Sequence, residues 1–196
     1  AKILHKAANL MREANDELAH LEVRDVGKVF NEAVSGDVPS GTDAFDYFAA
    51  CITAQNGDFN KWDKAIGYSV RVPLGVCAGI GAWNYPMQIA CWKSAPALAA
   101  GNAFILKPSE ETPLVAHKVA ELLQAAGLPD GLFQIIHGDR DIGAALCAHP
   151  GIAKISLTGG VETGRLIMAQ SAQSLKKITL ELGGKSPLLV FEDCDF

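Results

Sequence analysis

The chain has 196 residues, a formal net charge of −5, 49% hydrophobic residues and 20% charged residues. This length and apolar content suffice for a substantial buried core and exclude a largely disordered chain. The acidic balance argues against a nucleic-acid surface, and no apolar run is long enough to span a membrane. The five cysteines lack metal-type spacing and fit free thiols in a reducing compartment, so we expect a cytoplasmic protein.

The first 70 residues are expected to be mainly helical. Apolar residues recur at intervals of three and four, which predicts helices over residues 2–22, 26–30 and 44–54. Residues 36–41 are expected to interrupt this pattern because they are rich in glycine and polar residues. Residues 57–64 are polar and predict a loop. The alternating residues 66–72 predict an edge strand or one arm of a hairpin.

From residue 70 onward, short apolar strands alternate with helices. Strands are expected at residues 75–82, 103–106, 132–136, 152–157, 178–182 and 187–191. Helices are expected between them, at residues 86–100, 112–126, 141–148 and 161–171. This alternation predicts an α/β fold with a Rossmann-like, open, mostly parallel sheet and helices on both faces. We divide the chain into an N-terminal helical part, residues 1–70, and a Rossmann-like core, residues 71–196.

Ligands on open α/β sheets bind beyond the carboxyl ends of the strands, and two candidate catalytic residues fall there. Asn84 follows the strand at 75–82, and its side-chain amide is a candidate donor to a developing oxyanion. Taken alone, the commoner role for this asparagine is to cap the helix that begins at Pro86. Glu181 ends an apolar strand just before Gly183 and Gly184, which let a ligand approach the backbone. It is either a general base or a solvated strand end.

A second polar group follows the strand at 103–106. Lys107 and Glu110 are three residues apart, so both could bond one ribose diol, the lysine donating and the carboxylate accepting. The alternative, favoured by spacing alone, is a solvated turn before a helix capped by Thr112.

A glycine-rich turn joins the strand at 152–157 to the helix at 161–171. Its run is Thr158-Gly159-Gly160-Val161-Glu162-Thr163-Gly164. The unpaired N–H groups and the dipole at a helix start suit a phosphate. The pattern is not G-x-G-x-x-G, so an ordinary tight turn remains the alternative.

The helix at 86–100 carries three residues with two interpretations each. Tyr85 and Trp92 are seven residues apart and share one helical face. They are either core aromatics or pocket walls that hold a quaternary ammonium group by cation–π attraction. Lys93, in an otherwise apolar helix, either extends its amine to solvent or is paired inside, which would be functional.

No cysteine is a convincing nucleophile, because a reactive thiol needs a helix N-terminus or a cationic neighbour. The five are Cys51, Cys77, Cys91, Cys147 and Cys194. The histidines are scattered, and we assign them no role.

Taken in order, these segments resemble the NAD(P)-dependent aldehyde dehydrogenase superfamily. The resemblance covers essentially the whole chain, more strongly after Val70. It begins at Pro73-Leu74-Gly75-Val76 and continues through Gly81-Ala82-Trp83-Asn84-Tyr85-Pro86, Lys107-Pro108-Ser109-Glu110, Thr158-Gly159-Gly160 and Glu181-Leu182-Gly183-Gly184-Lys185-Ser186-Pro187. Within the superfamily, residues 83–99 and the Thr158-Gly159-Gly160 turn are typical of the betaine aldehyde dehydrogenase branch.

The resemblance implies roles for individual residues. Asn84 would stabilise the oxyanion of a thiohemiacetal, Glu181 would be the general base, and Lys93 would belong to a charge relay. Tyr85 and Trp92 would line an aromatic box for a trimethylammonium head. NAD, with NADP as the alternative, would contact Gly81, Ala82, Trp83, Lys107, Pro108, Ser109, Glu110, Gly160, Val161, Glu162, Thr163 and Gly183. Asp25 and the backbone at Glu111 match potassium positions of the branch.

The same resemblance implies that the catalytic cysteine lies downstream of Phe196, together with a second cofactor-binding glutamate and an oligomerisation arm. We therefore expect a fragment that is inactive alone. Its parent, expected to be a homo-oligomer (a dimer of dimers), would oxidise betaine aldehyde to glycine betaine through a thioester. The alternatives are a 4-trimethylaminobutyraldehyde or other aldehyde dehydrogenase, and a non-catalytic truncated nucleotide-binding module.

Overall fold

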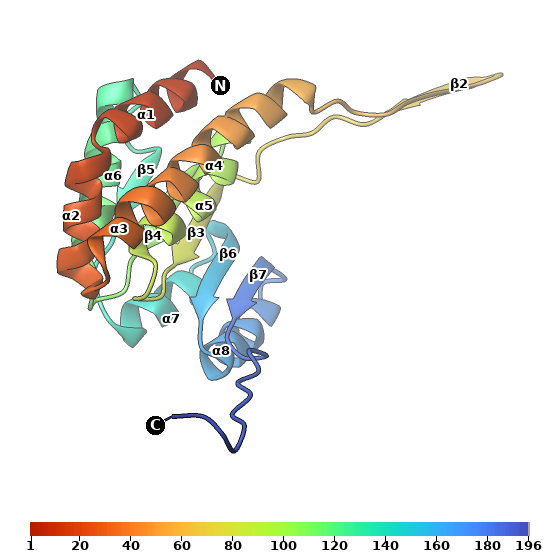
Figure 1. Ribbon diagram of the computed structural model, residues 1–196. Coiled ribbons are helices and arrows are strands. Elements are labelled where there is room, and N and C mark those ends of the chain that lie inside the picture. The colour runs from red at the N-terminus through yellow and green to blue at the C-terminus, as the bar shows by residue number, and fades with distance from the viewer. Residues whose placement is uncertain (196) are drawn as a thin grey trace.

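A five-stranded parallel sheet forms the centre of the molecule, in the order β5-β4-β3-β6-β7 (Figure 1). The structure is a computed structural model that describes residues 1–195; Phe196, the last residue of the expected core, lies outside the described residues. The strands are β3 (Val76–Ile80), β4 (Ala103–Lys107), β5 (Phe133–Ile135), β6 (Ile152–Gly159) and β7 (Lys177–Leu182). The predicted α/β class with an open parallel sheet is therefore confirmed.

Helices cover both faces of this sheet. They are α5 (Pro86–Ala99), α6 (Leu114–Ala126), α7 (Arg140–Ala148) and α8 (Val161–Ala172). Successive strand residues point to opposite faces. Cys77 and Phe104 accordingly pack in the cluster that contains α5 and α6, whereas Ala78 and Ile80 pack with residues of α7 and α8.

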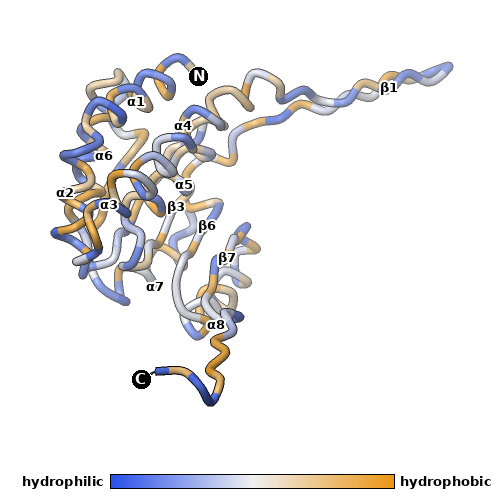
Figure 2. Tube along the Cα trace, viewed as in Figure 1, coloured by the Kyte–Doolittle hydropathy of each residue, from blue (hydrophilic) through white to orange (hydrophobic). Residues whose placement is uncertain are grey.

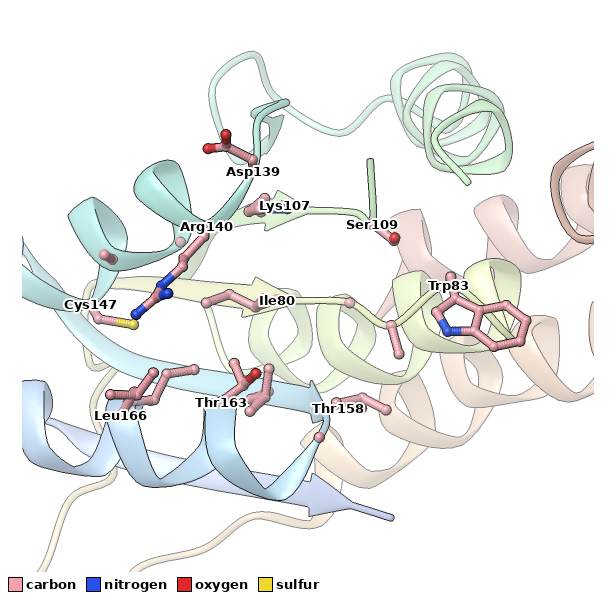
Figure 3. A pocket seen from close by; sticks show the side chains of 18 of the residues that line it. Ile80, Trp83, Lys107, Ser109, Asp139, Arg140, Cys147, Thr158, Thr163 and Leu166 are labelled. Carbon is pink, nitrogen blue, oxygen red and sulfur yellow. The ribbon is translucent and has the colours of Figure 1, made fainter. Parts of the chain in front are cut away.

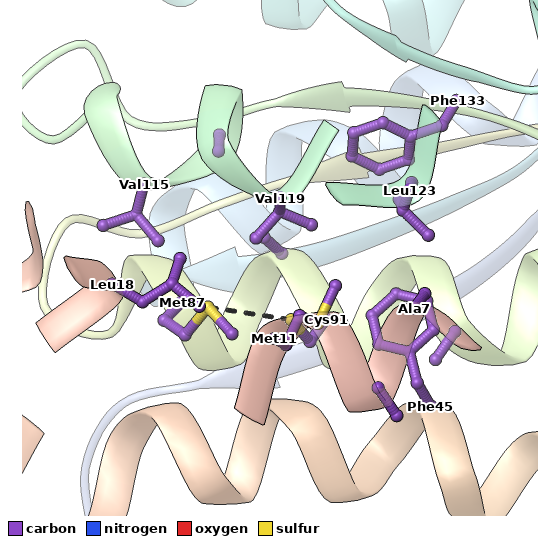
Figure 4. Close-up of a cluster of buried hydrophobic side chains, with 14 of the residues drawn as sticks. Ala7, Met11, Leu18, Phe45, Met87, Cys91, Val115, Val119, Leu123 and Phe133 are labelled. Carbon is purple, nitrogen blue, oxygen red and sulfur yellow. Dashed lines mark hydrogen bonds between the residues drawn. The ribbon is translucent and has the colours of Figure 1, made fainter. Parts of the chain in front are cut away.

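The N-terminal helices form an outer layer over α5 and α6. They are α1 (Lys2–Glu13), α2 (Asn15–Val26), α3 (Phe30–Glu32), the π turn η1 (Ala33–Asp37), α4 (Val38–Cys51) and the 3₁₀ turn η2 (Ile52–Ala54). Met11 of α1, Phe45 of α4, and Met87 and Cys91 of α5 meet in one buried cluster (Figure 4). The N-terminal layer thus shares a core with one face of the sheet.

This layer departs from the sequence prediction in three places. Periodicity predicts one helix over residues 2–22, but the chain bends at Ala14, where φ is −93° and ψ is 16°. Residues 27–29 are not helical, because Gly27 ends α2 in the left-handed conformation with φ +78°. The break predicted at residues 36–41 is wrong, since η1 and α4 continue through it. Gly41 lies against Met87 and Cys91, so close packing on α5 compensates for its weak helix propensity.

Two other segments complete the description. β1 (Phe59–Trp62) and β2 (Ala65–Tyr68) pair as an antiparallel hairpin that projects from the body (Figure 1). The predicted loop at 57–64 is therefore wrong over β1, and the hairpin arm predicted at 66–72 is confirmed over residues 66–68. Residues 187–191 form no strand; the described residues hold no strand beyond β7 with which they could pair. Among the described residues, no helix has the length and apolarity needed to cross a membrane.

Candidate active site

A cavity of about 1030 Å³ opens at the carboxyl ends of the strands. It lies where the chain changes direction in the sheet: β4 and β5 lie on one side of β3, and β6 and β7 on the other. Such a switch point is the usual ligand site of an open α/β sheet. Figure 3 shows side chains from α7, α8 and the ends of β3 and β4 around this space.

Asn84 and Glu181 both line this cavity. Asn84 follows β3, and Glu181 lies on β7 opposite Thr158 of β6, so the two residues flank the end of β6. The capping role considered for Asn84 is not seen, because Tyr85 is the N-cap residue of α5 and no side-chain bond caps this helix. The structure therefore brings an amide and a carboxylate to one ligand-sized space.

Lys93 of α5 is buried against β6. Its Nζ donates a hydrogen bond to Ser156 Oγ at 3.0 Å, so the amine is paired inside rather than extended to solvent. The missing side chain of Gly79 makes room for it, since a Cβ there would lie 3.2 Å from Lys93 Cδ. Burial lowers the Lys93 pKa to about 8, and the charge of Glu181 opposes this shift. Lys93 is thus a buried cation within electrostatic range of the candidate base.

Lys107 and Glu110 form an ion pair at the end of β4. Lys107 is almost fully buried, and its Nζ lies 3.2 Å from Glu110 Oε2 and 3.0 Å from the Pro108 carbonyl oxygen. A hydrogen bond from Glu110's own backbone N–H, aided by Lys107, lowers the Glu110 pKa against the effect of desolvation. The two side chains thus offer a donor and an acceptor at one cavity wall, as a ribose diol requires.

The alternative interpretation of this turn, with Thr112 as the cap of the next helix, is wrong. Pro113 is the N-cap residue of α6, and Thr112 Oγ1 is buried without a hydrogen-bond partner. Asp25 of α2 takes the capping role from another part of the chain: its carboxylate accepts the N–H groups of Leu114 at 3.2 Å and Val115 at 3.0 Å.

Only some residues of the glycine-rich turn between β6 and α8 line the cavity. Gly159, Gly160 and Thr163 line it. Glu162 instead pairs with Arg165 at 2.6 Å, and neither Glu162 nor Val161 is among the lining residues. Backbone N–H groups at the start of α8 are therefore the feature that suits a phosphate here.

Of the other residues expected to contact the cofactor, all but one line the cavity. Gly81, Ala82, Trp83, Ser109 and Gly183 line the cavity, and Pro108 does not. Gly81 is tightly placed, because a Cβ there would lie 3.2 Å from Ile89 Cγ2.

Tyr85 and Trp92 lie outside this cavity. Their side chains are 44% and 49% exposed, so the interpretation as core aromatics is wrong. Tyr85 lines a second cavity of about 630 Å³ with Lys28, Asp37 and Asn84. Trp92 Nε1 donates to the Ser40 carbonyl oxygen at 3.3 Å.

Sequence reasoning missed one wall of the main cavity. Residues from the loop before α7 and from α7 itself line it, namely Asp139, Arg140, Asp141, Gly143, Ala144 and Cys147. A signal was present: Asp139 follows a strand and Gly138, and its side chain caps α7 by accepting the Asp141 N–H at 3.0 Å. Recognising this cap would have started the helix one residue earlier, at Arg140.

Three of the five cysteines are buried thiols. Cys147 lines the cavity wall but is fully buried, and desolvation raises its pKa. Cys77 and Cys91 are also buried with raised pKa values, for the same reason. A raised pKa keeps a thiol protonated and weakly nucleophilic.

The sequence matches the aldehyde dehydrogenase family over residues 1–196. The chain belongs to this family. It is 57% identical over 195 residues to the betaine aldehyde dehydrogenase of Agrobacterium fabrum and to that of Rhizobium etli, in each case covering 99% of this chain and 40% of the relative. The chain thus spans about two-fifths of the length of these relatives.

Solved structures agree with this assignment. An aldehyde dehydrogenase from Bacillus cereus in complex with NAD⁺ superposes with a TM-score of 0.92 at 38% identity, over 99% of this chain and 40% of that one. A γ-glutamyl-γ-aminobutyraldehyde dehydrogenase from Burkholderia cenocepacia gives a TM-score of 0.91 at 43% identity, over 95% of this chain and 38% of that one. The parallel sheet with its flanking helices therefore matches about two-fifths of the fold of these aldehyde dehydrogenases.

Proposed function

We propose that this chain is the cofactor-binding part of an NAD-dependent aldehyde dehydrogenase whose intact form oxidises betaine aldehyde to glycine betaine. One observation carries the proposal: Asn84, Glu181 and the Lys107–Glu110 pair line a single cavity at the switch point of the sheet. The similarity to betaine aldehyde dehydrogenases supports the choice of substrate.

The dinucleotide fits the residues that are present. Lys107 and Glu110 would hold a ribose diol, the backbone at Gly160 and Thr163 would face the diphosphate, and Gly81 and Gly183 would let the cofactor lie against the chain. When bound, NAD supplies the hydride acceptor. The carboxylate of Glu110 disfavours a phosphate on the ribose, which is why we propose NAD over NADP.

In the proposed reaction this chain supplies an amide and a base. The Asn84 side-chain N–H donates to the aldehyde oxygen as negative charge develops on it. The Glu181 carboxylate accepts a proton from the nucleophilic thiol or from the water that hydrolyses the thioester. Lys93 provides a positive charge within electrostatic range of that carboxylate. We propose that the thiol comes from outside these 196 residues.

The proposal is tested by Glu181→Gln in the intact enzyme. Glutamine keeps the shape of the side chain but accepts no proton at neutral pH, so kcat should fall at least about 100-fold while the KM for NAD changes little. The measurement is NADH formation from betaine aldehyde. Glu121→Gln, which changes an exposed carboxylate on α6 in the same way, is the matched control and should leave kcat unaltered. An unchanged kcat in Glu181→Gln would remove the carboxylate from its role.

The substrate is tested on the unmodified enzyme with three aldehydes. These are betaine aldehyde, its uncharged isostere in which a tert-butyl group replaces trimethylammonium, and 4-trimethylaminobutyraldehyde. A higher kcat/KM for betaine aldehyde than for both others supports the proposal. A preference for the longer aldehyde would instead assign the enzyme to that substrate. Equal values for the charged and uncharged pair would refute recognition of trimethylammonium by Tyr85 and Trp92.

Three further features belong to the same proposal. The parent enzyme would be cytoplasmic and a homo-oligomer, a dimer of dimers. Potassium would be held near Asp25 and the backbone at Glu111, which lies three residues before the Leu114 N–H bound by Asp25. Thermal unfolding of the intact enzyme in potassium and in sodium would test that site.

A further inference from the structure

A buried charge cluster lies behind the Asn84–Tyr85 turn, and the proposed function does not use it. Its members are Glu22 of α2, Lys28 in the loop after Gly27, and Asp37, the last residue of η1. The Glu22 side chain is fully buried, and those of Lys28 and Asp37 are only 11% and 9% exposed. Lys28 Nζ lies 3.3 Å from Glu22 Oε1 and also contacts Asp37 Oδ2. One lysine is thus shared by two carboxylates that are almost fully buried.

This cluster holds the beginning of α5 by two contacts. Glu22 Oε2 accepts the Met87 N–H at 3.1 Å, and this N–H is one of those that a helix start leaves without a partner. Lys28 Nζ lies 4.2 Å from the centre of the Tyr85 ring, within the range of a cation–π contact. Both contacts fall within three residues of Asn84.

The second cavity connects the cluster to the candidate active site. Lys28, Asp37, Asn84 and Tyr85 line it together, and Asn84 also lines the cofactor cavity. Asn84 and Tyr85 are consecutive residues, so contacts that hold the Tyr85 ring also hold the backbone that carries the Asn84 side chain. The ammonium of Lys28 lies over one face of the ring, so a second cation could contact only the other face.

A contribution to the stability of the fold does not by itself explain why these charged residues are buried together. Desolvation is the largest influence on Glu22 and raises its pKa to about 7, even though Lys28 and the Met87 N–H favour the ionised form. Buried ion pairs of this kind often contribute no more to stability than apolar side chains of equal volume. What the charges provide, and apolar side chains would not, is a fixed direction for the groups that they contact.

We propose that Lys28, held by Glu22 and Asp37, is a positioning residue of the active site. It fixes the Tyr85 ring as a wall for a cationic substrate and, through the Asn84–Tyr85 peptide, orients the amide that faces the oxyanion. The inference rests on the proposed function in taking Tyr85 as a substrate contact and Asn84 as the oxyanion donor.

The experiment uses the intact enzyme with Lys28→Met and Lys28→Arg, each in the natural background and with Tyr85→Ala. Betaine aldehyde and its uncharged tert-butyl isostere are the substrates. Lys28→Met should lower the preference for betaine aldehyde about fivefold to tenfold, chiefly through KM, and leave the KM for NAD within about twofold. Lys28→Arg keeps the cation and both carboxylate partners and should restore most of the preference.

The double variant separates positioning from general loss of structure. In the Tyr85→Ala background, Lys28→Met should cause no further loss of preference, because the ring through which it acts is gone. Equal losses for both substrates in both backgrounds would overturn the proposal, as would an arginine variant no better than methionine. Lys118→Met removes another lysine that is paired with two glutamates and should change neither preference nor KM.

Two further measurements are needed if Lys28→Met does not fold or if the proposed substrate is wrong. Where Lys28→Met does not fold, Asp37→Asn retains the Glu22–Lys28 contact and should show a smaller loss of the same kind; an unchanged preference would contradict the proposal. If the natural enzyme does not prefer betaine aldehyde over its tert-butyl isostere, the proposed substrate is wrong. The inference is then tested by measuring kcat with the isostere only. Lys28→Met and Asn84→Ala must then be non-additive in kcat, and additivity would overturn it.

Discussion

Lys93 shows how the surroundings of one residue determine its response to pH. Its folded-state pKa of about 8 lies below the ordinary 10.5, because burial disfavours the ammonium. Between these values the unfolded chain binds more protons than the folded chain, so stability rises with pH. The contribution of this group is fully present above the unfolded pKa and is lost as pH falls through about 8.

Lys93→Met should therefore change stability in a pH-dependent way. The variant carries no buried ammonium, so its thermal midpoint relative to the natural enzyme should be higher near pH 7 than near pH 10. The loss of the Ser156 hydrogen bond is common to both conditions and cancels in the comparison. Thermal unfolding of the intact enzyme at the two pH values checks this. A midpoint difference independent of pH would show that Lys93 does not titrate as the structure implies.

At the scale of an element, β3 depends on its glycine. A Cβ on Gly79 would lie 2.6 Å from Phe104 Cζ and 3.2 Å from Lys93 Cδ. Phe104 is buried and stacked on Phe133, so it has little room to move. Gly79→Ala should lower the free energy of unfolding by about 1–3 kcal/mol and displace Lys93. Urea unfolding measures the first effect.

The matched control is Gly36→Ala in η1. A Cβ there would meet nothing within 4 Å, and alanine favours helical backbone, so stability should stay the same or rise slightly. If the two alanine variants lost equal stability, close packing at Gly79 could not be the cause.

The individual helices and strands also show which features can be predicted from the sequence. The strands of the sheet and the positions of Asn84, Lys107 and Glu181 at their ends follow from local apolar runs and the glycines after them. The Asp25 cap of α6 joins residues 89 positions apart, and the Glu22 contact with Met87 spans 65 positions. No local pattern reveals such contacts. The wrongly predicted break at residues 36–41 has the same cause, because the helical state of Gly41 depends on packing against α5.

At the scale of the whole molecule, the segment after β7 is unpacked, as is the projecting β1–β2 hairpin. Leu188, Leu189, Val190 and Phe191 are between 55% and 86% exposed, and they form the apolar stretch near the C-terminus in Figure 2. Consecutive exposed apolar residues beside the edge strand β7 favour association between chains. We expect the 196-residue chain, prepared alone, to self-associate.

Replacing Leu188 and Val190 by aspartate should reduce this association, as measured by light scattering across a concentration series. Leu175→Asp is the control: this leucine is 89% exposed but lies in a turn away from the segment, so its replacement should have little effect. Equal scattering from the natural chain and the double aspartate variant would show that another surface drives association.

The strand order also has a consequence for the growing polypeptide. During synthesis β3, β4 and β5 emerge first and can pair. One long side of β3 stays open until β6 pairs with it, and β7 then pairs with β6. The amide at residue 84 thus exists early, whereas the opposing carboxylate reaches it only when β7 docks on β6. A ribosome-bound intermediate cut short before β7 would have the lysine–glutamate clamp at 107 and 110 but only part of the cofactor cavity. Dinucleotide affinity would then report whether β7 has docked.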